Sequence, residues 1–135
     1  MRVLGIDYGA KKTGLAVTDP LQIIASGLET VATGNLTAYL KKYIAKEPVS
    51  KIVIGYPRHP DGNPAQLADT ITAFGEGLRK DHPGLEIVYQ DESYTSSQAR
   101  DIILRSGIGK KKRRDKTLVD KISAVLILQA YLQHI

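Results

Sequence analysis

Residues 2–18 of this 135-residue chain are RVLGIDYGAKKTGLAVT, and this stretch decides the fold. Residues 2–8 and 14–18 are short runs rich in β-forming residues, separated by a turn that contains two lysines. This pattern predicts a β-hairpin. Residues 21–31 are a third strand candidate, set off by the turn-prone pair Asp19 and Pro20. We therefore expect three adjacent antiparallel strands at the start of the chain.

The remainder of the chain alternates between helical and strand patterns. Apolar residues at helical spacing and buried-strand runs predict helices at 35–46, 64–80 (or from 63), 95–106 and 117–133, and strands at 51–56 and 85–89. Strands that alternate with helices are typical of parallel pairing through crossovers. The expected fold is therefore α/β, with a mixed five-stranded sheet flanked by helices. Because no linker or repeat divides it, we expect one domain over residues 1–135.

The charge of the chain is concentrated in one segment. The net charge is +5, from 19 Lys plus Arg and 14 Asp plus Glu. The segment 110–116 alone accounts for this excess, with one acid, Asp115, among its basic residues Lys110, Lys111, Lys112, Arg113, Arg114 and Lys116. Such a run indicates a polyanionic partner such as nucleic acid, although a solvated loop is the alternative interpretation.

Some classes of protein are excluded by composition. The chain has no cysteine, which excludes disulfides, cysteine-ligated zinc and a thiol nucleophile. It shows neither a signal peptide nor a long apolar span, so we expect a cytoplasmic protein with no membrane partner.

Three acidic residues are candidates for a metal site. Asp7 ends the first strand, Glu92 ends the fifth, and Asp120 lies in the first turn of the last helix. If the first and fifth strands run parallel around the fourth, Asp7 and Glu92 emerge at one edge, where ligands collect in such sheets. A helix across that edge would add Asp120. Carboxylates without His or Cys favour Mg²⁺ or Mn²⁺, and two such ions about 4 Å apart clamp a phosphodiester for hydrolysis.

Each acid also has a purely structural interpretation. Asp7 can cap the turn at Gly9, Glu92 can be a solvated residue after a strand, and Asp120 can form a capping box with Thr117. The helix that follows favours a further role for Asp120, because residues 122–128 are apolar nearly all round and predict burial. An acid that enters a buried helix needs a partner or a metal.

Four segments resemble one protein family. Residues 7–19, DYGAKKTGLAVTD, closely resemble the opening signature of the YqgF/RuvX family. Its later blocks are matched by GYP at 55–57 with Asp61 and Gly62, by DESYTS at 91–96, and by Lys116 with DKISAVLIL at 120–128. The resemblance spans essentially the whole chain, in order. It implies a ribonuclease H-like fold related to RuvC and a metal-dependent nuclease site at Asp7, Glu92 and Asp120.

The resemblance also implies an activity. Family members are described as nucleases that mature the 5′ end of 16S rRNA and as Holliday junction resolvases, so the expectation is a divalent-metal-dependent endonuclease acting on precursor rRNA or four-way DNA. Lys11, Lys12, Arg58 and the basic run are expected to contact phosphates. Ser93 stands where the family usually has arginine, and serine cannot hold a phosphate bidentately.

Two other interpretations remain open at this stage. One is a nucleic-acid-binding module without catalysis. In this interpretation the basic run binds the nucleic-acid backbone, and Ser93 indicates that catalytic activity has been lost. The other is an actin-like ATPase or sugar kinase, whose phosphate-binding hairpin resembles residues 7–14 but which needs two such domains. Paired cuts in a junction would require a homodimer, whereas RNA trimming needs one site.

Overall fold

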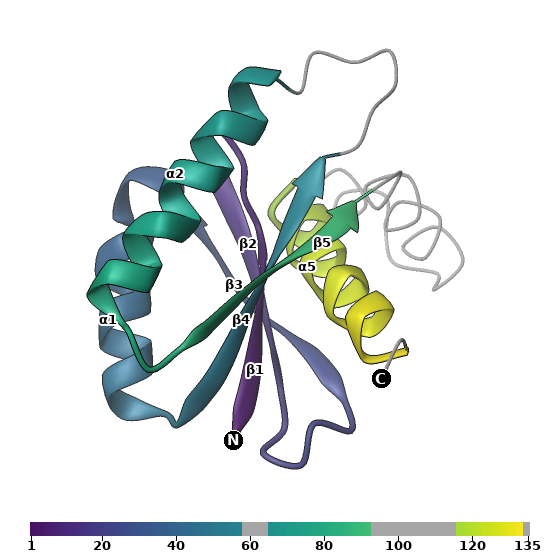
Figure 1. Ribbon diagram of the computed structural model, residues 1–135. Helices are drawn as coiled ribbons and strands as arrows, with labels where there is room; N and C mark the ends of the chain where they lie inside the picture. The colour runs from purple at the N-terminus through teal and green to yellow at the C-terminus, as the bar shows by residue number, and fades with distance from the viewer. Residues whose placement is uncertain (58–64, 93–115, 134–135) are drawn as a thin grey trace, which may run out of the picture.

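The computed structural model describes residues 1–57, 65–92 and 116–133, which form one sheet covered by helices on both faces (Figure 1). The elements are β1 Arg2–Asp7, β2 Lys12–Thr18, β3 Ala25–Ala32, the 3₁₀ turn η1 Thr33–Asn35, α1 Leu36–Lys46, β4 Val49–Pro57, α2 Ala65–Asp81, β5 Glu86–Glu92 and α5 Lys116–Gln133. The helix expected at 95–106 lies outside the described residues, as do positions 63 and 64.

The sheet is mixed, as the sequence predicted. Its strand order is β3-β2-β1-β4-β5. The pairs β1–β2 and β2–β3 are antiparallel, whereas β1–β4 and β4–β5 are parallel. The three N-terminal strands therefore form an antiparallel meander, and β1 and β5 run parallel on either side of β4.

Each face of the sheet has its own hydrophobic core, because successive strand residues point to opposite faces. Helices α1 and α2 cover one face and α5 covers the other (Figure 1). The first core contains Leu4, Ile6, Leu15, Val17, Leu36, Leu40, Val49, Ile52, Ile54, Ile71, Leu78 and Ile87. The core under α5 contains Val3, Ala16, Val53, Ala124, Ile127 and Leu128. The parity of a strand residue therefore indicates which helix layer it faces.

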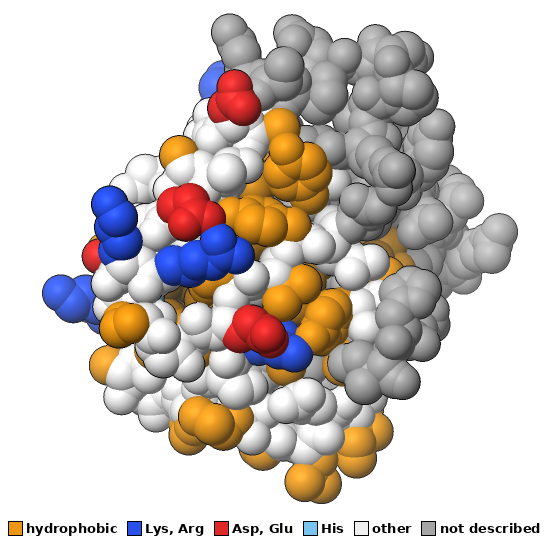
Figure 2. Space-filling view, in the orientation of Figure 1, with side chains coloured by type: hydrophobic (Ala, Val, Ile, Leu, Met, Phe, Trp, Pro, Cys, Tyr) orange, Lys and Arg blue, Asp and Glu red, His pale blue; other side chains and the backbone are white. Residues whose placement is uncertain are grey.

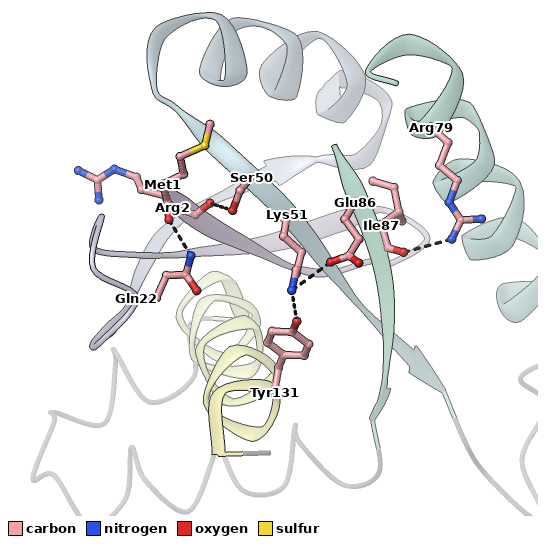
Figure 3. Close-up of polar contacts among 9 residues, drawn as sticks. All are labelled: Met1, Arg2, Gln22, Ser50, Lys51, Arg79, Glu86, Ile87 and Tyr131. Carbon is pink, nitrogen blue, oxygen red and sulfur yellow. Dashed lines mark hydrogen bonds and ion pairs between the residues drawn. The ribbon is translucent and has the colours of Figure 1, made fainter. Parts of the chain in front are cut away.

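Helix α5 lies close against the sheet. A Cβ added at Gly5 of β1 would lie 2.5 Å from Cγ of Leu128. Ser123 and Ala124, both fully buried, are small enough to allow this approach. At the far end of α5, the Lys51 ammonium of β4 donates a hydrogen bond to the Tyr131 hydroxyl and pairs with Glu86 of β5 at 3.0 Å (Figure 3). The C-terminal half of the helix is thus bonded to β4, through a lysine that is itself paired with β5.

The third strand begins later than predicted. β3 starts at Ala25 instead of residue 21, because the Asp19 carboxylate organises residues 20–24 as a turn. It accepts hydrogen bonds from the backbone N–H groups of Leu21, Ile23 and Ile24 at 3.2, 2.7 and 2.8 Å. The hydrogen bond from Ile24 is the main reason why the pKa of Asp19 lies below its usual value.

Smaller differences concern the ends of other elements. The predicted helix start at residue 35 is a 3₁₀ turn, and α1 begins at Leu36. β5 continues through residue 92, so Asp91 belongs to the strand. α5 begins at Lys116, which places Asp120 at the start of its second turn. None of the helices in the described part of the chain is both long and apolar enough to cross a membrane.

Candidate active site

The carboxyl ends of β1, β4 and β5 meet at one edge of the sheet. Asp7 is the last residue of β1 and Glu92 the last of β5. Ile6 is in register with Ile54, and Gly55 with Gln90, so Asp7 lies level with Gln90. Glu92 is therefore two residues, about 7 Å, further along, and two strand spacings of about 4.8 Å separate the backbones of β1 and β5.

Asp7 and Glu92 also share a face of the sheet. Asp7 has the parity of Val3, which belongs to the core under α5. Position 92 has the parity of Val88, which packs against the same core. Strand alternation therefore assigns both acidic positions to the α5 face, and position 91 to the opposite face.

Helix α5 brings the third acidic position to this face. Position 120 lies one helical turn before Ala124 and three residues before Ser123, which are both fully buried against the sheet. The adjacent residue Lys121 lies over β3, because a Cβ added at Gly27 would be 3.6 Å from Lys121 Cβ. On this face, the N-terminal part of α5 thus lies over β3 at one side of the sheet, and Glu92 lies on β5 at the other side. β1, which carries Asp7, lies between them.

The turn that follows Asp7 is tightly built. A Cβ at Gly9 would overlap the carbonyl oxygen of Lys12, so the position requires glycine. Gly9 is bonded to two threonines: its N–H lies 3.5 Å from Thr13 Oγ1, and its carbonyl oxygen accepts a 2.7 Å hydrogen bond from the Thr33 hydroxyl. The hairpin after Asp7 exposes Lys11 and Lys12, and Lys12 lies two residues from Gly14, which is paired with Asp7.

The aromatic residues described near this edge belong to the other face. Tyr8 packs against Phe74 of α2 with ring centroids 5.2 Å apart. Tyr56 makes an edge contact with Tyr89 at 5.7 Å. These tyrosines are therefore part of the packing under α2, on the face opposite to Asp7.

The described surface is hollowed at the other end of the molecule. A cavity of about 750 Å³ is lined by Leu21, Gln22, Ile23, Ile24, Ala25, Gln129 and Leu132. Figure 2 shows exposed hydrophobic side chains at this lower end, where Figure 1 places the β2–β3 loop. The cavity lies at the amino end of β1, away from Asp7, and has no titratable side chain. It is not a candidate for phosphodiester chemistry.

Several predicted site residues lie outside the described part of the chain. These are Arg58, Ser93 and the basic residues Lys110, Lys111, Lys112, Arg113 and Arg114. Glu92, Asp120 and Lys116 are placed by their strand or helix, and their side chains lie outside the described ones. Among the side chains that are described, no group of three or more His, Asp or Glu could hold a metal. Thr33 was not singled out from the sequence, because it is 24 residues from its partner Gly9.

Comparison with known proteins identifies the family. The family model described as "RuvX: Holliday junction resolvase" matches residues 1–134. A relative from Porphyromonas gingivalis, named "Putative pre-16S rRNA nuclease", is 50% identical over 133 residues, covering 98% of this chain and 96% of the relative. A Flavobacterium psychrophilum relative of the same name is 46% identical over 131 residues, covering 97% and 96%.

Solved structures show the same fold. T. thermophilus RuvC in complex with a Holliday junction substrate superposes with a TM-score of 0.62 at 18% identity, covering 99% of this chain and 96% of that one. Fowlpox virus resolvase with substrate Holliday junction DNA gives 0.61 at 12% identity, covering 99% and 98%. Together with the sequence matches, they show that this chain has the ribonuclease H-like fold and belongs to the RuvX family.

Proposed function

We propose that this protein is a divalent-metal-dependent endonuclease whose site consists of Asp7, Glu92 and Asp120. The observation that supports this most strongly is the common placement of the three positions. Asp7 and Glu92 end strands that run parallel, on the face that α5 covers, and Asp120 lies where α5 begins to cross that face. Two of these positions therefore end parallel strands on one face of the sheet, and the third belongs to the helix that covers this face.

The chemistry of these residues fits a hard divalent cation. Carboxylate oxygens are the preferred ligands of Mg²⁺ and Mn²⁺, and the three residues offer no softer donor. The Ser123 hydroxyl, one turn from Asp120, is fully buried and lacks a hydrogen-bond partner among the described residues. Because an unpaired buried hydroxyl is costly, it favours an ordered polar group such as a solvated ion at this end of α5. Two bound ions would stabilise the charge of the phosphoryl transition state and lower the pKa of water.

The protein's own residues would bind and orient the nucleic acid. Lys11 and Lys12 are exposed on the turn next to Asp7, within reach of phosphates that approach this edge. The basic run 110–114 and Arg58 would add phosphate contacts that position a strand but do not read its sequence. Ala124 and Leu128 are fully buried between α5 and the sheet and would exclude water from the inner side of the proposed site.

Precursor 16S rRNA is the first candidate substrate. Relatives 46–50% identical to this chain carry the name of a pre-16S rRNA nuclease. Four-way junction DNA is the second candidate, because the family model and the solved structures name Holliday junctions. A module that binds nucleic acid without cutting it is the alternative to both.

A cleavage panel tests this proposal. Wild type and Asp7→Asn are incubated with Mg²⁺ or Mn²⁺ and a labelled 16S precursor 5′ fragment, a four-way junction, a matched duplex and single-stranded RNA. We expect wild type to cut one of the first two substrates and Asp7→Asn to cut none. Binding without cleavage by wild type would contradict the nuclease and favour the binding module, and Ser93→Arg would then test whether the missing arginine explains it.

A further inference from the structure

A closed ring of hydrogen bonds holds the turn after Asp7. The Thr33 hydroxyl donates its one proton to the Gly9 carbonyl oxygen at 2.7 Å. In the 2.9 Å pair between the two threonine hydroxyls, Thr13 must therefore be the donor. Thr13 Oγ1 in turn accepts from the Gly9 N–H at 3.5 Å. The ring begins and ends on Gly9, and each hydroxyl both donates and accepts.

Thr33 also holds the other end of the same turn. Its backbone N–H donates a 2.9 Å hydrogen bond to the carbonyl oxygen of Lys11. One residue at the junction of β3 and η1 is thus bonded to the turn at both Gly9 and Lys11. Thr13, through which the ring closes, is fully buried, so the ring is anchored in the core.

We propose that Thr33 is a positioning residue for nucleic acid, which holds the turn in the shape that presents Lys11 and Lys12 beside Asp7. The inference rests on the proposed function, since the two lysines matter only if a polyanion binds at this edge. Asp7 itself is held by strand pairing, because it is in register with Gly14 of β2. Loss of the ring would therefore affect the lysines more than the carboxylate.

The substitution Thr33→Val isolates the hydroxyl. Valine keeps the β-branched shape and the backbone hydrogen bond to Lys11, but it removes the partner of the Gly9 carbonyl. The pairing of Lys12 with Ala32 and of Thr13 with Val31 keeps β2 and β3 together. We therefore expect a folded protein with a looser turn.

The experiment measures binding of a fluorescein-labelled 16S precursor 5′ fragment and a labelled four-way junction, in EDTA, by fluorescence anisotropy. Thr33→Val should weaken the binding that wild type shows by about five-fold or more, a coupling typical of residues in one network. Thr33→Ser, which keeps the hydroxyl, should bind like wild type. So should Thr72→Val, which removes an exposed hydroxyl whose bond is local to α2.

A combined variant separates positioning from general stability. Adding Thr33→Val to Lys11→Ala/Lys12→Ala should cost no further affinity, because the lysines through which Thr33 acts are already gone. The slope of log affinity against log salt should fall by up to about 0.9 for each duplex phosphate that the protein no longer neutralises, or about 0.7 for single strands. Melting curves accompany each variant, and Thr33→Ala removes the same hydroxyl if the valine variant does not fold.

Two results would overturn the inference while leaving the nuclease intact: wild-type affinity in Thr33→Val, or an equal loss when it is added to the double lysine variant. If wild type binds neither probe in EDTA, the inference fails, because it requires that Lys11 and Lys12 bind the polyanion without metal. The cleavage panel with Asp7→Asn reports on the nuclease independently.

Discussion

Leu128 of α5 packs directly on Gly5 of β1, two residues before Asp7. The two residues are so close that a methyl group at position 5 would lie 2.5 Å from Leu128 Cγ. Leu128 is fully buried, so a shift of its side chain would disturb the packing around it. Glycine at position 5 therefore sets the depth at which α5, and with it Asp120, lies on the sheet.

Gly5→Ala should destabilise the protein by about 1–3 kcal/mol, the usual cost of overpacking a core. Urea denaturation of wild type and variant measures the difference. The added methyl should also lift α5 from β1, so we expect cleavage to fall more than the folded fraction does.

Gly77→Ala is the matched control. Gly77 lies within α2, and nothing is within 4 Å of an added Cβ there. Alanine in a helix is favoured over glycine by about 1 kcal/mol, so this variant should be equally or more stable than wild type. Equal stability of Gly5→Ala and wild type would contradict the close seating of α5.

Tyr39 should make the protein sensitive to alkali. Burial, together with a hydrogen bond to Glu29, raises the pKa of Tyr39 from 10.0 to about 12. Between these values the unfolded chain loses the phenolic proton while the folded protein keeps it, so stability is intact below pH 10 and falls as the pH rises toward 12. Tyr39→Phe should therefore lose less stability over this window than wild type, as measured by denaturant midpoints at each pH.

The Phe variant should not be insensitive to alkali. Burial also raises the pKa of Tyr43 and of Tyr89, and both contribute in the variant as in wild type. Superimposable curves for Tyr39→Phe and wild type would show that Tyr39 ionises alike in the folded and unfolded chains.

Asp19 should make the β2–β3 loop sensitive to acid. Hydrogen bonds from the loop, led by that of Ile24, hold the pKa of Asp19 below 3.8. The bonds are therefore intact above that pH and weaken as the pH falls through the lowered value. Hydrogen-exchange protection factors of the Ile23 and Ile24 amides should fall in acid in wild type and be low at all pH values in Asp19→Ala. Protection that is the same in both proteins would contradict the role of Asp19, and Asp69→Ala on α2 serves as the control.

The strands, the faces to which their residues point and the order of the strands in the sheet were predictable from the sequence. The apolar runs identified all five strands. The first three are joined by short hairpin turns and the last two by helical crossovers, and this pattern is consistent with a sheet in which β1 and β5 lie on either side of β4. Asp7 was found because it stands beside Gly9 in a short local motif. The parallel ends of β1 and β5 then bring Glu92 to the same edge, as expected.

Features that depend on particular side-chain hydrogen bonds or on long-range packing were not predictable. The turn at residues 20–24 is made by three hydrogen bonds to the Asp19 carboxylate, which outweigh the strand propensity of Ile23 and Ile24. Thr33 has no motif of its own, and its role arises only when β3 pairs with β2 and brings it to Gly9. The tight fit between Gly5 and Leu128 likewise requires the packed helix.

The most direct test of the central claim is the single-turnover cleavage rate of the substrate that wild type cuts, at saturating Mg²⁺, for Asp7→Asn, Glu92→Gln and Asp120→Asn. Asp19→Asn, which alters an acid at the opposite end of the sheet, is the matched control. The first three should each lose about 10³-fold or more in rate with unchanged melting temperatures, since each would remove a ligand of the catalytic ions. Asp19→Asn should cut like wild type. Wild-type cleavage by a folded Asp7→Asn protein would contradict the account.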